Sequence, residues 1–122
     1  MKLLDTDVLI EIIKQNKIEE LREAYISIIT LLEYLRGIKD EEEREIVKEN
    51  IEKIVQIVNL ENKSILIYSK MHEKLKARGI LISDADLLQA SIAIANNFTF
   101  VTRNTKHFKR LEEFGLKILN YQ

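Results

Sequence analysis

Short apolar runs alternate along the chain with longer segments in which apolar residues recur every three or four positions. The apolar runs predict β-strands at residues 2–4, 25–29, 54–58, 98–102 and 117–119. The spacing in the longer segments is typical of amphipathic helices and predicts them at residues 6–14, 30–37, 40–53, 61–78 and 84–96. Strands that are apolar throughout and alternate with helices favour an α/β fold, with a central, mostly parallel sheet of about five strands flanked by helices on both faces.

Length and composition add limits to this picture. The chain has 122 residues, no proline and three scattered glycines, so we expect one domain over residues 1–122 without an internal linker. No apolar run approaches the ~20 residues that a bilayer requires, and the N-terminus lacks a cleavage-site pattern, which predicts a cytoplasmic protein without membrane association. The absence of cysteine excludes thiolate nucleophiles and cysteine zinc sites.

The distribution of aspartate is unusual for a chain whose acidic residues are mostly glutamate. Four of its five aspartates form two Asp-x-Asp pairs in apolar contexts, Asp5 with Asp7 and Asp84 with Asp86. Aspartate is unfavourable inside helices, so its use here indicates that a short carboxylate is needed at a defined position. Hard divalent cations are bound by such carboxylates.

The predicted elements bring these acids to one edge of the sheet. Asp5 ends the first strand, Glu33 lies one turn after the second, and Asp86 lies in the first turn of the last helix, while Asn104 follows the fourth strand. The carboxyl ends of strands are where ligands bind in open α/β sheets. Clustered carboxylates repel unless a cation neutralises them, and without a His or Cys cluster the cation expected is Mg²⁺ or Mn²⁺ rather than zinc.

Each acid also has a purely structural interpretation. Thr30-x-x-Glu33 and Ser83-x-x-Asp86 match the capping box, and Asp5 is suited to be a helix N-cap. His107 follows the fourth strand close to the proposed site, where it could contact RNA or phosphate, although an ordinary surface histidine is the favoured interpretation.

Basic residues form only local groups, because the net charge of −1 provides no overall attraction to nucleic acid. Those nearest the acids are Arg36 with Lys39, and Arg103, Lys106, Lys109 and Arg110. Helix solubility explains them as well as RNA binding does.

Four segments of the chain resemble, in their order and spacing, the motifs of PIN-domain ribonucleases of the VapC toxin type. These segments are LLDTDVLI, SIITLLEYLRG, ISDADLLQASIAIA and FVTRNTKHF. The resemblance places the family's acids on Asp5, Glu33 and Asp86, and its supporting polar positions on Thr6, Asp7, Thr102 and Asn104. This chain departs from the family where Gln89 replaces an aliphatic residue and His107 replaces an aspartate. Asp84 or Asp7 would have to supply the missing carboxylate.

The resemblance implies a PIN-like fold and an Mg²⁺- or Mn²⁺-dependent endoribonuclease that hydrolyses RNA phosphodiester bonds. It also implies a toxin of a type II toxin–antitoxin system, inhibited by a VapB-type antitoxin and usually a homodimer. The metal ligands would be Asp5, Glu33 and Asp86, with Asp84 as a further catalytic acid. The residues expected to contact RNA are Arg36, Arg103 and Lys106.

Two alternatives remain open at this point. A catalytically weak PIN-fold binding module is compatible with Asn104 in an acidic position. A haloacid-dehalogenase-like phosphatase would use Asp5 as nucleophile and Asp7 as general acid, but the chain lacks the expected glycine turn after Asp7 and a clear later lysine motif.

Overall fold

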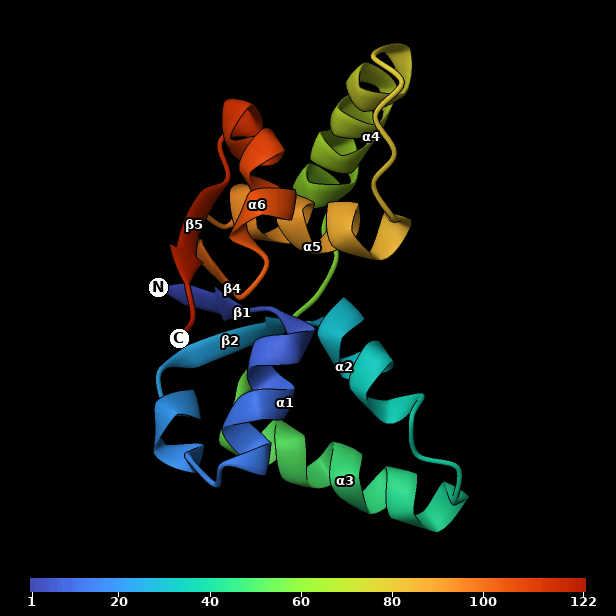
Figure 1. Cartoon of the computed structure of the whole chain (residues 1–122). Helices are drawn as coiled ribbons and strands as arrows, with labels where there is room; N and C mark the ends of the chain where they lie inside the picture. The colour runs from blue at the N-terminus through green and yellow to red at the C-terminus, as the bar shows by residue number, and fades with distance from the viewer.

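The computed structural model describes all 122 residues and contains a single five-stranded sheet. The strand order is β3-β2-β1-β4-β5, and every neighbouring pair is parallel (Figure 1). The strands are β1 (Lys2–Leu4), β2 (Ala24–Ser27), β3 (Gln56–Val58), β4 (Thr99–Thr102) and β5 (Lys117–Asn120). The predicted α/β fold class is confirmed.

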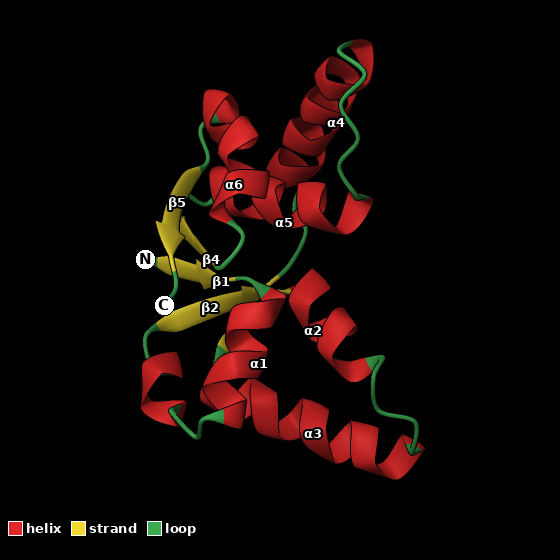
Figure 2. Ribbon diagram, viewed as in Figure 1, coloured by secondary structure: helices red, strands yellow, loops and turns green.

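Helices cover both faces of the sheet, with α1 and α3 on one side and α4, α5 and α6 on the other (Figure 2). The α-helices are α1 (Thr6–Lys14), α2 (Ile28–Leu35), α3 (Glu41–Ile54), α4 (Asn62–Ala77), α5 (Asp84–Ala95) and α6 (Thr105–Phe108). Two short 3₁₀-helices, η1 (Ile18–Leu21) and η2 (Lys109–Phe114), complete the fold. No helix is both long and apolar enough to span a membrane.

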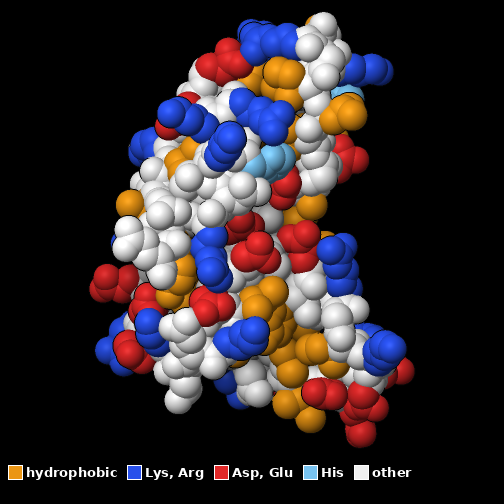
Figure 3. Space-filling view, viewed as in Figure 1, with side chains coloured by type: hydrophobic (Ala, Val, Ile, Leu, Met, Phe, Trp, Pro, Cys, Tyr) orange, Lys and Arg blue, Asp and Glu red, His pale blue; other side chains and the backbone are white.

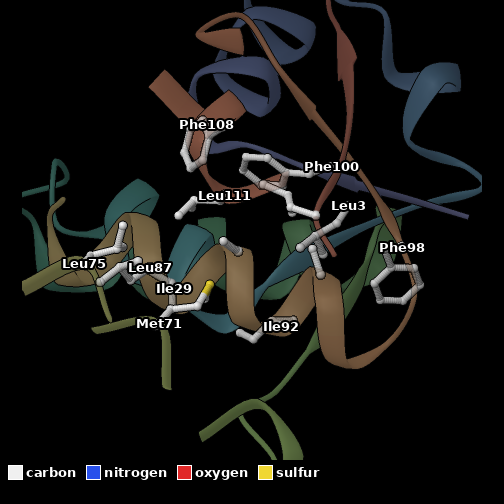
Figure 4. Packing of buried hydrophobic residues seen from close by; sticks show 13 residues of the cluster. Leu3, Ile29, Met71, Leu75, Leu87, Ile92, Phe98, Phe100, Phe108 and Leu111 are labelled. Carbon is white, nitrogen blue, oxygen red and sulfur yellow. The ribbon is translucent and has the colours of Figure 1, made fainter. Parts of the chain in front are cut away.

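Two hydrophobic cores lie on opposite faces of the sheet because successive strand residues point in opposite directions. Leu3 and Phe100 belong to the core under α4, α5 and α6 (Figure 4). Their neighbours Leu4 and Val101 belong to the core under α1 and α3. The central strands β1, β2 and β4 are thus largely buried on both sides, which explains their mostly apolar sequences, whereas the edge strands β3 and β5 are more exposed.

Two predicted boundaries and three short helices differ from the expectation. The second strand ends at Ser27, whose hydroxyl accepts a hydrogen bond from the Thr30 N–H and caps α2, so the helix begins two residues earlier than predicted. The third strand begins only at Gln56, because Ile54 is the last residue of α3. The helices η1, α6 and η2 were not predicted, since four to six residues are too few to show a helical period.

The carboxyl ends of β1 and β4 lie side by side at the point where the strand order reverses direction. From β1 the chain builds outward through β2 and β3, and β4 and β5 are then added on the other side of β1. Such a topological switch point is the usual ligand site of an open α/β sheet. Asp5 follows β1 and Thr102 ends β4, so both reach this point.

Candidate active site

Asp5 is held in a fixed orientation between α1 and β4. It is the N-cap of α1, and its Oδ1 accepts a hydrogen bond of 2.8 Å from the Thr6 N–H. Its Oδ2 accepts one of 2.8 Å from the hydroxyl of Thr102, and its own N–H donates to the carbonyl of Val101. Only 9% of Asp5 is exposed, so the predicted N-cap is confirmed but does not account for the burial of the carboxyl group.

Burial raises the pKa of the Asp5 carboxyl, and the hydrogen bonds from Thr102 and Thr6 oppose this rise only in part. The negative charges of Asp7 and Asp86 raise the pKa further. Asp5 takes part in none of the ion pairs of the structure. A buried carboxylate without a positive partner is unfavourable, and a bound cation would compensate for it.

Glu33, on α2, is half-buried and linked to α1. Its Oε1 accepts a hydrogen bond of 2.6 Å from the hydroxyl of Thr6, which lies 3.0 Å from the hydroxyl of Thr30. The capping-box interpretation of Thr30 and Glu33 is wrong, because Ser27 is the N-cap and both residues lie inside the helix. Glu33 is therefore free of a capping role.

Gln89 of α5, 1% exposed, joins the two acids from the other side. Its Nε2 lies 3.5 Å from Asp5 Oδ1 and 3.4 Å from Glu33 Oε1, and its Oε1 accepts a hydrogen bond of 2.9 Å from Thr30. No buried side-chain polar atom lacks a hydrogen-bond partner, so the buried amide is satisfied where it lies. The sequence did not identify Gln89 as part of the site; the available signal was a polar residue at an otherwise apolar motif position.

The two acids of the second pair point to different elements. Asp86 is half-buried, and its Oδ2 lies 2.9 Å from Nε2 of His107, a half-buried residue of α6. Asp84 is exposed and accepts a hydrogen bond of 2.7 Å from the hydroxyl of Tyr68 on α4. Ser83 does cap the N–H of Asp86, but this is only half of a capping box, since the Asp86 carboxylate faces His107. The prediction of His107 as an ordinary surface residue is therefore wrong.

The remaining polar residues of the predicted site make fewer contacts. Asp7 is exposed in the first turn of α1, although its charge still acts on Asp5. Asn104 is exposed, and its backbone N–H, not its side chain, donates a hydrogen bond to the hydroxyl of Thr102. The structure thus brings Asp5, Glu33, Thr6 and Thr102 together, places Asp86 near them, and leaves Asp7, Asp84 and the Asn104 side chain at the margin.

Basic side chains border the acids. Arg36 lies 3.7 Å from Glu33 Oε2, and Arg103 lies 3.4 Å from Oε2 of Glu11 on α1. Lys106 is exposed and forms no ion pair. Figure 3 shows acidic side chains gathered in a hollow of the surface, with lysine or arginine side chains around it. Such a border suits a polyanionic ligand that reaches an acidic centre.

The oxygen donors fit a hydrated hard cation. No three acidic or histidine side chains stand close enough together to hold one ion by themselves. Mg²⁺ does not require this, because it usually keeps several waters and is bound through one or two carboxylates. Buried Asp5, with Glu33 beside it and the charge of Asp86 acting on it, provides such carboxylates, and no sulfur ligand is present to favour zinc.

A hollow of about 680 Å³ lies elsewhere, beside η1 and the C-terminal residues. Its lining includes Glu20, Arg22 and Tyr121 but none of the acids predicted for the site. It therefore offers no alternative centre for the chemistry of Asp5.

Comparison with known proteins gives consistent similarities over nearly the whole fold. The PIN domain family model matches residues 2–113. The chain is 46% identical over 117 residues to Ribonuclease VapC1 of Methanocaldococcus jannaschii, covering 95% of this chain and 85% of that protein. It is 33% identical over 95 residues to Ribonuclease VapC2 of Rickettsia felis, covering 75% of this chain and 71% of that protein.

Solved structures show the same architecture. A chain of the Rickettsia felis VapBC2 structure, bound to a DNA fragment from the promoter, superposes with a TM-score of 0.80 at 28% identity, covering 99% of this chain and 98% of that one. A chain of VapBC-1 from nontypeable Haemophilus influenzae superposes with a TM-score of 0.81 at 26% identity, covering 98% and 96%.

Proposed function

Because this chain belongs to the PIN domain family, we propose that it is an Mg²⁺- or Mn²⁺-dependent endoribonuclease that hydrolyses RNA phosphodiester bonds. The observation that carries this proposal is the buried carboxylate of Asp5, which has no cationic partner and lies at the switch point of the sheet beside Glu33. Two similar proteins are named ribonucleases, which supports RNA as the substrate.

Each residue has a role that follows from its contacts. Asp5, Glu33 and Asp86 would hold the cation together with water molecules that complete its coordination, and the cation when bound polarises a phosphoryl oxygen and makes water more acidic. Thr102 and Thr6 orient the carboxylates of Asp5 and Glu33 through their hydroxyl groups.

Proton transfer and RNA binding fall to residues around this centre. Asp86, whose other neighbour is His107, would orient or deprotonate the attacking water, with Asp84 acting only from the margin. The side chains that would bind RNA phosphates are those of Arg36, Arg103 and Lys106.

The proposed biological setting is a type II toxin–antitoxin system, with this chain as a cytoplasmic toxin and homodimer inhibited by a VapB-type antitoxin. The similar solved structures are of VapBC assemblies, which supports such a partner. Leu32, Leu66 and Leu81 are exposed and therefore available for contact with such a partner.

One alternative is favoured by a specific observation. The Asn104 side chain makes no hydrogen bond and stands where an acid was expected, as in a PIN-fold binding module of weak activity. The phosphatase alternative has no support, since the similarities found are to PIN-domain proteins.

Removal of divalent cations tests the proposal. The purified protein should cleave structured RNA in the presence of Mg²⁺ or Mn²⁺ and lose this activity in EDTA, because the carboxylates alone provide no Lewis acid. Re-addition of Mn²⁺ should restore cleavage, which controls for damage by the chelator. Undiminished cleavage in EDTA contradicts the mechanism, and Mn²⁺ binding without any cleavage favours the binding module.

Charge reversal at Arg103 tests the proposed RNA path. Arg103→Glu should weaken RNA binding and reduce the slope of log K against log salt by about 0.7 or more, the contribution of one phosphate contact on a single strand. Arg22→Glu, a charge reversal at the amino end of β2, is the matched control and should leave the slope unchanged. An unaltered slope in Arg103→Glu places the RNA elsewhere.

A further inference from the structure

Gln89 lies on α5 and contacts both Asp5 and Glu33 through its side-chain amide. Neither acid belongs to α5. The Nε2 of Gln89 is almost equally far from the two carboxylates, 3.5 Å from Asp5 and 3.4 Å from Glu33. Both distances are long for an N–H···O bond, as expected for an amide placed between two acceptors rather than docked on one. An amide has two N–H hydrogens, so each carboxylate has one available.

The orientation of this amide is fixed by its surroundings. Ionised carboxylates only accept hydrogen bonds, so the NH₂ group and not the carbonyl oxygen faces Asp5 and Glu33 when both acids are charged. The carbonyl oxygen of Gln89 then accepts from the hydroxyl of Thr30 at 2.9 Å. Thr30 is completely buried and Gln89 nearly so, so neither group has water as an alternative partner.

The amide leaves other oxygens of the acids available. On Glu33, both Thr6 and Gln89 bind Oε1, while Oε2 has only the exposed ion pair with Arg36 at 3.7 Å. On Asp5, Gln89 shares Oδ1 with the Thr6 N–H, while Oδ2 accepts from Thr102 alone. The amide therefore draws the carboxylates together without using all of their lone pairs.

We propose that Gln89 is a positioning residue for the cation site: its amide, oriented by Thr30, holds Asp5 and Glu33 together before a divalent cation binds. This inference rests on the proposed metal-dependent function and concerns a position at which this chain departs from the motif it resembles. The amide offsets part of the electrostatic repulsion between the two carboxylates. Less of the free energy of cation binding is then needed to bring the carboxylates together.

The test is the affinity for Mn²⁺, measured by isothermal titration of the full chain without RNA. Gln89→Met keeps the length and flexibility of the side chain but removes the N–H donors, and should raise the dissociation constant about 10- to 100-fold. Thr30→Val removes the hydroxyl that orients the amide while keeping the shape, and should weaken binding in the same direction. Thr30→Ser retains the hydroxyl and should restore an affinity close to that of the wild type.

The outcomes separate this inference from the proposed function. If the wild type binds Mn²⁺ and folded Gln89→Met binds it equally or more tightly, the positioning role is overturned. The nuclease proposal then remains intact. If Gln89→Met does not fold, equal Mn²⁺ affinities of Thr30→Val and Thr30→Ser overturn the role instead. A wild type that binds no Mn²⁺ but cleaves RNA in EDTA overturns both proposals.

Discussion

Replacement of Asp5 by Asn is expected to reduce RNA cleavage by at least roughly 100-fold while the protein stays folded. Activity depends on the negative charge, since a neutral amide is a poor ligand for a hard cation. The fold should survive because asparagine is as good an N-cap as aspartate, and its amide can still exchange hydrogen bonds with Thr6 and Thr102. Single-turnover cleavage in Mn²⁺ and circular dichroism measure the two effects.

The same variant should be more stable than the wild type at neutral pH when no metal ion is present. Burial raises the pKa of Asp5 in the folded state, so the folded protein binds this proton more tightly than the unfolded chain. The stabilisation is complete below the unfolded pKa and is lost as the pH rises through the higher folded pKa. The asparagine side chain of the variant has no such proton to lose, so the variant should not show this decline.

Urea unfolding in EDTA across the acidic and neutral range measures this difference. Asp40→Asn is the matched control, because Asp40 also caps a helix through its side chain but is exposed. It should show no gain at neutral pH. Unfolding of Asp5→Asn, or a loss of stability equal to that of a broken cap, would instead support a purely structural role for Asp5.

The fold was predictable because a sheet that is buried on both faces requires consecutive apolar residues in its central strands. Leu3 and Leu4 face different cores, as do Phe100 and Val101, so apolar residues follow one another in these strands and stand out from the charged helices. Boundaries were less predictable where one polar atom decides them. The hydroxyl of Ser27 ends β2 and starts α2 inside a continuous apolar segment, and hydrophobicity alone does not reveal this.

The arrangement of the candidate site was predictable to the extent that the ends of the strands determine it. Asp5 was expected beside Glu33 because both follow neighbouring parallel strands, and Gln89 now links them. The contact of Gln89 with both acids and that of His107 with Asp86 were not expected. Gln89 is 84 positions from Asp5, and His107 lies on a four-residue helix without a period, so only the packing of α5 and α6 over the sheet shows their contacts.

Asp86→Asn and Asp84→Asn should have clearly different effects on cation binding. Residues two apart on a helix point about 200° from each other, so the two carboxylates cannot face one ion from within α5. Asp86 is half-buried beside His107 and its charge reaches Asp5, whereas Asp84 is exposed and bound to Tyr68. We therefore expect Asp86→Asn to lose Mn²⁺ binding and RNA cleavage almost completely.

Asp84→Asn should retain measurable Mn²⁺ binding with a higher dissociation constant, because it removes a nearby negative charge but no direct ligand. Tyr68→Phe removes only the hydroxyl that holds Asp84 at α4, at a distance of 2.7 Å, and is the matched control. It should bind Mn²⁺ like the wild type, since it leaves every charge in place. If isothermal titration gives the reverse order for the two aspartates, Asp84 is the ligand and must turn away from Tyr68 when the cation binds, even though the nuclease proposal would stand.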